Sequence, residues 1–409
     1  MWVKLGALRP KLPRGRSRPT RTMQVLPLLA VRARVQLGMP LPFSVRSADK
    51  TLLLAAGQML RDEGQFDELF ERGAVVELEE LKAAFGADDP LFAPRRHAEA
   101  KAIAAAVLPQ RWAECTARVA AALAPEAAQR LPALALASRN LALLVQRSAN
   151  LAMSQIVRPE AAGQAHYGIT HAMNAAIACL VTARTLGWRE DEQQRALHAA
   201  LTMNLSIIDL QGRLAHQVSP LTAMQRQLID EHPLRSAEML EADGVDDGAW
   251  LAAVREHHET PEGKGYPNRC APGSELSQLL RFADIYTALM SRRATRAAMS
   301  THDAAREIYA LAEGNPLCQA LIKSFGVFPP GCFVRLASDE VGVVTGNGDK
   351  AYHPRVAVLA LSDGQARRTP VWRDTAHEAH RIVALLSESA MPIRVSAQAL
   401  ASAIDGNPG

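Results

Sequence analysis

Two adjacent histidines stand near the start of the stretch that decides the fold, Glu256-His257-His258-Glu259-Thr260-Pro261-Glu262-Gly263-Lys264-Gly265-Tyr266-Pro267. The pattern predicts a helix that ends at the histidines, followed by a Gly-x-Gly turn and a rigid Tyr-Pro pair. Neighbouring side chains on a helix point about 100° apart, so both imidazoles reach one ion only if it lies between them. Histidine pairs also occur on solvated surfaces, so the pair alone leaves a metal site and an ordinary surface pair both open.

The composition is that of an ordinary soluble globular protein, with 48% hydrophobic and 22% charged residues, and 409 residues are enough for two or three domains. The five scattered cysteines have no C-x-x-C spacing, which argues against a disulfide framework and against a zinc knuckle. We therefore expect a reducing, cytoplasmic compartment. Apolar runs end well short of the roughly 18 residues that a membrane span needs, so no membrane anchor is expected.

The net charge of +4 comes from residues 1–22, which carry seven basic side chains and no acidic one. The rest of the chain has a net charge of −3, and it lacks the broad basic field of a nucleic-acid-binding protein. Residues 1–22 also lack the apolar core of a signal peptide, so we expect a disordered basic lead, with Met1 or Met23 as the true start.

Four sections follow the basic lead. Residues 23–95 combine short Val- and Leu-rich runs with a helical segment, which predicts a small α+β domain. The Ala- and Leu-rich residues 96–159 predict linking helices, and residues 160–325 predict a helical domain. Alternating residues with Gly-containing turns in residues 326–409 predict a short β-rich appendage, closed by a helix at Glu378–Ser389 and followed by a loose tail.

Three further polar residues lie on predicted helices of the helical section, namely His171, His232 and Asp284. Neutral imidazole and carboxylate are the usual ligands for iron, manganese or zinc. A helical bundle can bring such side chains from separate helices to one interior point. For any single histidine, a hydrogen-bonded and partly buried position is the more frequent outcome, so these residues permit a metal site without requiring one.

These residues also carry a resemblance to the HD-GYP family of the HD superfamily, over residues 160–336. The stretch from His257 to Pro267 is similar to the family signature HHE-x-x-D-G-x-G-Y-P, with Glu262 in the place of the aspartate. Similar segments follow at Glu231–Pro233, Ala283–Leu289 and Arg293–Arg296. The resemblance implies a mainly α fold built on an HD-superfamily helical bundle, and a metal-dependent phosphodiesterase that acts on the bacterial messenger cyclic di-GMP.

The resemblance also assigns roles to single positions. The residues that match the metal ligands of the family are His171, His232, His257, His258 and Asp284, and those that match its phosphate-contacting positions are Arg293 and Arg296. The implied cofactor is one divalent transition metal, iron or manganese. We expect the loop of Gly263, Gly265, Tyr266 and Pro267 to be an interaction surface, with a diguanylate cyclase or another signalling protein as its partner.

The sequence departs from the family pattern at the histidine–aspartate pair itself. Where members read A-L-L-H-D-I-G-K, the segment Ala200–Ile207 has Met203, Asn204 and Ile207 in place of the histidine, the aspartate and the lysine. Tyr167 stands where some trinuclear members carry a glutamate. The resemblance therefore leaves no intact catalytic residue at these three positions.

The physical consequence of this departure is a weakened metal site. Two divalent ions about 3.5–4 Å apart need a bridging anion, which a neutral asparagine does not supply. A thioether is too soft to replace imidazole for manganese or iron. Each loss costs roughly 10² in rate if the group acts in the transition state. His232, His257 and His258 can still hold one ion with three nitrogens.

Three functions remain open at this point. The one we favour is a degenerate HD-GYP module that binds cyclic di-GMP without cleaving it, or that docks a signalling protein through the Tyr266-Pro267 loop. The second is an active, metal-dependent cyclic di-GMP phosphodiesterase. The third is a purely structural helical scaffold with leftover histidines. Nucleic acid and membranes are not expected as partners.

Overall fold

The structure is a computed structural model that describes residues 25–28, 31, 34–35, 38–86, 94–124, 129–158, 166–348, 350, 352–361 and 363–406. The disordered lead expected at residues 1–22 lies outside them. Contacts divide the chain into two compact units, the first formed by residues up to 93 without residues 71–73, and the second by those three residues and all residues from 94 onward.

The first unit has a small α+β fold. Its antiparallel sheet has the order β1-β4-β2-β3, and its elements are β1 (Val25–Pro27), β2 (Val45–Arg46), β3 (Leu52–Leu54), α1 (Glu63–Glu71), β4 (Val75–Glu77) and α2 (Leu78–Phe85). Phe43, Val45, Leu60 and Val76 are completely buried in its core. The strands are short, so buried side chains from the connecting segments complete this core.

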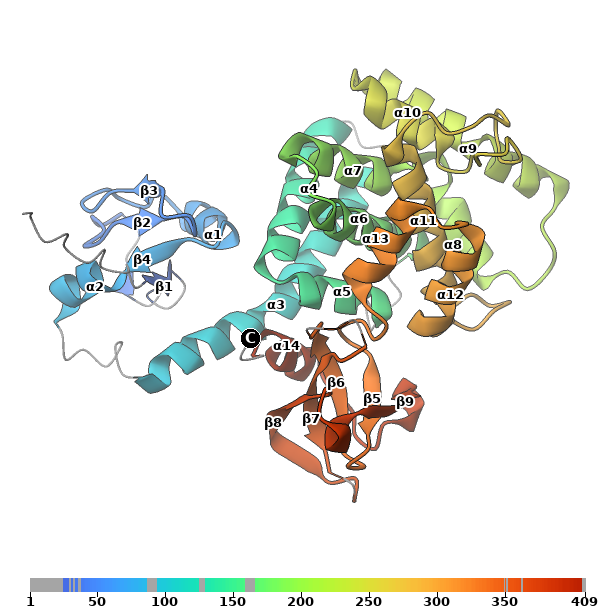
Figure 1. Ribbon diagram of the computed structural model, residues 1–409. Helices are drawn as coiled ribbons and strands as arrows, with labels where there is room; N and C mark the ends of the chain where they lie inside the picture. The colour runs from blue at the N-terminus through green and yellow to red at the C-terminus, as the bar shows by residue number, and fades with distance from the viewer. Residues whose placement is uncertain are drawn as a thin grey trace, which may run out of the picture. The chain divides into compact units, whose positions relative to one another are not determined.

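The second unit is mainly helical, which confirms the fold class expected from the sequence (Figure 1). Its helices are α3 (Pro94–Leu123), α4 (Arg130–Arg147), α5 (Ala149–Val157), α6 (Tyr167–Thr185), α7 (Glu190–Thr202), η3 (Leu205–Ile207), α8 (Ile208–His216), α9 (Ala223–Ala242), α10 (Gly248–Glu256), α11 (Glu275–Met290), α12 (Thr301–Leu311), α13 (Pro316–Phe325) and α14 (Ala397–Asp405). None of the described helices has the length and apolar character that crossing a membrane requires.

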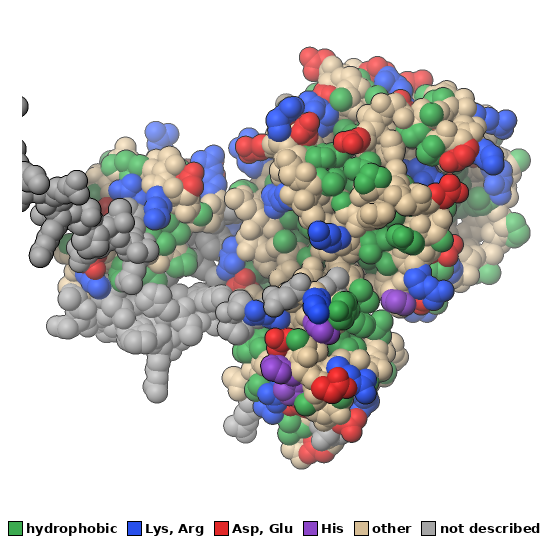
Figure 2. Space-filling model, in the orientation of Figure 1, with side chains coloured by type: hydrophobic (Ala, Val, Ile, Leu, Met, Phe, Trp, Pro, Cys, Tyr) green, Lys and Arg blue, Asp and Glu red, His purple; other side chains and the backbone are tan. Residues whose placement is uncertain are grey.

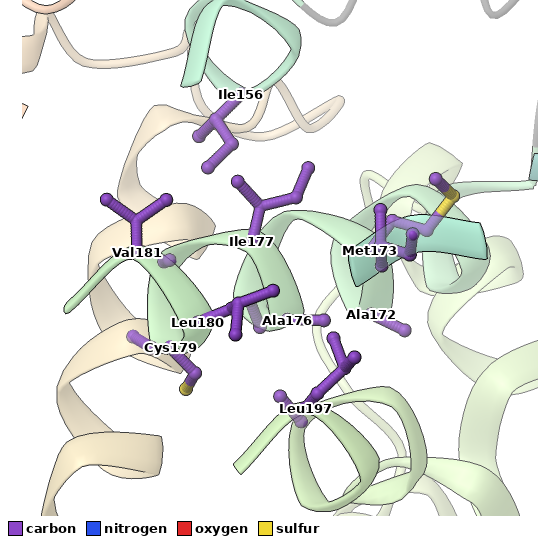
Figure 3. Packing of buried hydrophobic residues seen from close by; sticks show 14 of the residues in the cluster. Ile156, Ala172, Met173, Ala176, Ile177, Cys179, Leu180, Val181 and Leu197 are labelled. Carbon is purple, nitrogen blue, oxygen red and sulfur yellow. The ribbon is translucent and has the colours of Figure 1, made fainter. Parts of the chain in front are cut away.

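Helix α6 is the centre of this bundle. It is apolar on almost all sides and packs against α7, α8, α11 and α13. A helix that is hydrophobic all round has to be buried. Figure 3 shows Ile177 of α6 facing Ile156 of α5, and Ala176 facing Leu197 of α7 on the other side. Helices α3 to α5 belong to the same compact unit as α6 and share its hydrophobic core.

A five-stranded antiparallel sheet follows the helices. Its order is β8-β7-β6-β5-β9, and its strands are β5 (Phe333–Leu336), β6 (Val341–Gly346), β7 (Arg355–Ala360), β8 (Ala366–Asp374) and β9 (Ile382–Leu386). On the face shown in Figure 2, acidic and basic side chains are interspersed over the described residues of the second unit.

Two expectations about the end of the chain are wrong. In place of a helix at Glu378–Ser389, there are two short 3₁₀ turns, η4 (Glu378–His380) and η5 (Glu388–Ala390), with strand β9 between them. Strand β9 pairs with β5, whose backbone groups need partners along that edge. The tail is not loose either, because α14 begins at an N-cap from Ser396 and buries Leu400 and Ile404 in the core.

Candidate functional site

The paired histidines lie directly after the end of α10. The helix begins with Asp247, whose side chain accepts hydrogen bonds from the backbone of Ala249 and Trp250, and it ends at Glu256. Helix α10 packs against α9 and α11 (Figure 1). His257 and His258 therefore emerge from the helix end beside His232, which lies in the middle of α9.

Three of the predicted ligands form a compact cluster. Ligand atoms of His232, His257 and His258 all lie within 4.8 Å of one another. The Nε2 atoms of His232 and His257 are 3.2 Å apart, while the Nδ1 atoms face the carbonyl oxygens of Ile229 and Val254. An Nδ1–H that donates to a carbonyl leaves Nε2 as a lone-pair donor. Two lone pairs at this separation repel each other unless a cation lies between them, so the cluster fits one metal ion.

Burial keeps these imidazoles in their metal-binding form. Burial lowers the pKa of His232 to about 3, and it also lowers the pKa values of His257 and His258 below the ordinary value. Because the neutral ring is the form that binds metals, protons do not compete for this cluster at neutral pH.

The other two predicted ligands contact each other. Nε2 of His171, on α6, lies 2.7 Å from Oδ1 of Asp284, on α11, and both side chains are buried. Burial by itself raises the pKa of Asp284, but the hydrogen bond from His171 and the nearby imidazoles outweigh it and hold this pKa below its ordinary value. The five predicted ligands are thus arranged as a cluster of three histidines and a separate His–Asp pair.

A cavity of about 210 Å³ joins the cluster and the pair. Its walls include His171, His232, His258 and Asp284. Of the three positions at which the sequence departs from the family pattern, Asn204 and Ile207 line this cavity. Met203 is completely buried in the hydrophobic core and is not among the lining residues.

The two predicted phosphate-binding arginines have different surroundings. Arg293 is exposed, lines the cavity, and donates from Nη2 and Nε to the hydroxyl of Tyr167 at 2.7 and 3.1 Å. The Tyr167 ring in turn stacks on His171, and burial raises the pKa of Tyr167. Arg296 donates from Nη2 to the carbonyl of Ala288 at 2.7 Å, so it holds its loop against α11 and does not line the cavity.

The predicted interaction loop closes one side of the cavity. The Tyr266 ring stacks on His258 with ring centroids 4.4 Å apart. At Gly265 the chain passes so close to the His258 backbone that a Cβ would lie 2.3 Å from its carbonyl oxygen. Gly263 has a φ of 65°, which favours glycine. Pro267 and Lys264 line an open groove of about 700 Å³ between the loop and α9.

Glu259 holds this loop, a role that sequence reasoning missed. Its completely buried carboxylate accepts hydrogen bonds from the backbone nitrogens of Asn268, Arg269 and Cys270, at 2.6, 3.0 and 3.2 Å. Glu256, just before the histidines, accepts from the Gly273 nitrogen in the same way. The signal available in the sequence was the glutamate that follows the paired histidines in the signature itself, together with a second glutamate, Glu256, just before them.

Gln211 is a second residue that sequence reasoning missed. It lies on α8, lines the cavity, and its buried Oε1 has no hydrogen-bond partner among the described residues. Its spacing of four residues from Ile207 was the available signal, because such residues share one face of a helix.

Comparisons with known proteins cover this part of the chain. Residues 123–314 match the sequence model of a family described as HD domain. Cyclic di-GMP phosphodiesterase PA4108 of Pseudomonas aeruginosa is 27% identical over 202 residues, which are 47% of this chain and 48% of that protein. The chain thus spans about half the length of this curated relative. The solved structure of Bd1817, an HDG"Y"P protein from Bdellovibrio bacteriovorus, matches 73% of this chain and 97% of that chain, with 14% identity and a TM-score of 0.39.

Proposed function

Because the chain belongs to the HD-GYP family of HD-domain proteins, we propose that it binds cyclic di-GMP in the cavity between its histidines and Arg293, with little or no hydrolysis. The ligand class follows from the relative, which is named for this nucleotide. Arg293 supports it from this chain's own residues, because a guanidinium at the cavity wall is suited to a phosphodiester.

The observation that carries the loss of hydrolysis is the residue at position 204. A pair of divalent ions needs a bridging carboxylate, and the cavity presents the neutral amide of Asn204 instead. Among the described residues that line the cavity, Asp284 is the only carboxylate, and its Oδ1 already accepts the hydrogen bond of His171. The second ion therefore lacks the ligand that most effectively offsets the repulsion between the two ions.

One metal ion fits the remaining residues. His232, His257 and His258 would hold a divalent transition metal, iron or manganese, with three nitrogen atoms. When bound, such an ion attracts phosphate oxygens and polarises them. Burial of His232 and His257 and the carbonyl partners of their Nδ1 atoms orient these two rings towards this position in advance.

We also propose that the loop of Gly263, Gly265, Tyr266 and Pro267 binds a signalling protein such as a diguanylate cyclase. The buried carboxylate of Glu259 supports this, because it holds the segment after the loop in one conformation. A preformed surface loses less conformational entropy when it binds. The groove beside the loop carries both signs of charge, positive from Lys264 and Arg269 and negative from Asp230 and Glu231.

One sample tests the nucleotide proposal. Purified full-length protein is analysed for iron and manganese, titrated calorimetrically with cyclic di-GMP, and incubated with the nucleotide to detect linear product. We expect about one ion per chain, nucleotide binding, and negligible product. His257→Ala should lose the metal, whereas His302→Ala, an exposed histidine on α12, should retain it.

Two other results would lead to different functions. Product formation that His257→Ala abolishes would show an active phosphodiesterase, which the intact cluster of three histidines favours as the second candidate. A protein with neither metal nor nucleotide binding would leave the helical scaffold as its function.

A further inference from the structure

Polar atoms without partners gather at the cavity. Among the described residues, Nδ2 of Asn204, Oε1 of Gln211 and Nδ1 of His171 are buried and make no hydrogen bond. All three residues line the same cavity of about 210 Å³. Buried polar groups are hydrogen-bonded in the great majority of cases, so such a group in a cavity wall is available to bind a ligand that enters the cavity. Asn204 is the most telling of the three, because its unpartnered atom is an amide nitrogen that can donate to a ligand, and the residue is only 3% exposed.

The charges around the cavity favour an anion. Arg293 contributes a positive charge, and the negative charge of Asp284 is engaged with His171. A divalent ion at the three histidines would therefore leave the cavity with an excess of positive charge. A ligand that carries negative charge would offset this excess of positive charge, and its oxygen atoms could accept a hydrogen bond from the unpartnered Nδ2 of Asn204.

The geometry of Arg293 fits the same group. A guanidinium has five N–H donors. Two of its nitrogens donate to the Tyr167 hydroxyl, which holds the planar group beside the cavity and leaves other donors for a ligand. Asn204 and Arg293 line one cavity, and the two non-bridging oxygens of a phosphodiester can accept from both.

We propose that Asn204 is a phosphate-binding residue. Its amide nitrogen donates to a non-bridging oxygen of a nucleotide phosphodiester, while Arg293 donates to the same group. The inference rests on the proposed function and assigns one residue of this chain to phosphate binding. An aspartate at position 204 would repel the phosphate unless metal ions neutralised its charge, whereas the amide N–H of asparagine attracts the phosphate. An asparagine in place of the aspartate thus removes a carboxylate that could bridge two metal ions and supplies a hydrogen-bond donor for an anion.

The size of the cavity limits what it holds. A volume of about 210 Å³ is below the roughly 300–1,000 Å³ of sites that enclose a whole small molecule. The cavity therefore takes one phosphate and its neighbouring atoms. The rest of the nucleotide therefore lies outside this cavity.

The test compares three variants of the full-length protein, with cyclic di-GMP affinity and metal content measured on the same samples. Asn204→Ala should weaken nucleotide binding by about tenfold to a hundredfold, as expected for a lost hydrogen bond to a charged group, with unchanged metal content. Asn204→Asp, which keeps the side-chain shape, should weaken binding at least as much. Asn174→Ala removes an equally buried amide that does not line the cavity, and its affinity should match that of the wild type.

A further variant tests the second proposed contact to the phosphate, from Arg293, and leaves Asn204 unchanged. Tyr167→Phe removes the hydroxyl that holds Arg293, and it should weaken nucleotide binding severalfold without loss of metal. Wild-type affinity in both Asn204 variants would overturn the inference and leave the proposed function standing. So would an Asn204→Asp variant that gains metal and binds the nucleotide more tightly, because position 204 would then serve metal ions. A wild-type protein that binds no nucleotide would overturn the proposed function as well.

Discussion

Replacing Glu259 by glutamine tests how the loop after the paired histidines is held. The buried carboxylate accepts from Asn268 and Arg269 on Oε1, at 2.6 and 3.0 Å, and from Cys270 on Oε2, at 3.2 Å. Glutamine keeps the shape and one oxygen, so two of these bonds can persist as neutral ones. Its amide nitrogen then faces the Cys270 N–H, so a donor meets a donor and the third bond is lost.

The size of the effect follows from these three bonds. A bond to a charged group contributes about 1.5–3 kcal/mol and a neutral bond about 1 kcal/mol, so two weakened bonds and one lost bond total several kcal/mol at most. Asn268, Arg269 and Cys270 are exposed, so water can replace part of what is lost. We therefore expect Glu259→Gln to destabilise the loop by about 2–3 kcal/mol and Glu259→Ala by about 3–5 kcal/mol.

Limited proteolysis between residues 260 and 273 reports loosening of the loop directly, and urea unfolding of the full-length protein reports any global loss of stability. The matched control is Glu262→Gln, in the same loop, because Glu262 is exposed and accepts no hydrogen bond from the described residues. We expect it to change stability by no more than about 0.5 kcal/mol. Equal cleavage rates and equal stability for Glu259→Gln and Glu262→Gln would refute the role given to Glu259.

Two further predictions concern the histidine cluster and the loop glycine. Burial lowers the pKa of His232 from 6.5 to about 3, so the unfolded chain binds a proton that the folded protein does not, and His257 and His258 act in the same direction. The metal-free protein should therefore lose stability as the pH falls from 6.5 towards 3, by about 1.4 kcal/mol per pH unit for His232; urea midpoints below pH 7 measure this, and a flat profile would contradict it. In Gly265→Ala the new Cβ would lie 2.3 Å from the His258 carbonyl oxygen, so thermal unfolding should show a loss of about 2 kcal/mol or more, unlike Gly248→Ala, whose Cβ meets nothing within 4 Å.

The helical character of the chain was predictable because it depends on local patterns. The apolar content of residues 167–185 favours a buried helix, and the structure places α6 at the centre of the bundle. The segment at Glu378–Ser389 shows where prediction from local patterns fails, because a helix was expected there and the structure has strand β9. Its residues are compatible with a helix, but pairing with β5 supplies backbone partners that a local pattern does not reveal.

The candidate site was predictable as a set of residues but not as an arrangement. His232, His257 and His258 lie on segments about 25 residues apart, and packing of α10 against α9 brings their rings together. His171 and Asp284 were expected among the ligands of one site, and the structure joins them to each other. Which ligands meet depends on how the helices are rotated about their axes, and one residue of sequence changes that direction by about 100°.

The sequence by itself determined which chemical groups are available: five potential metal ligands, two candidate phosphate-binding arginines, and an amide where the family pattern has a carboxylate. Only the tertiary structure decided what these groups face. Met203 and Asn204 are neighbours at the end of α7, yet one side chain is in the hydrophobic core and the other in the cavity wall. The physical reason is that burial and hydrogen-bond partners come from other helices, whose positions the packing of the whole core determines.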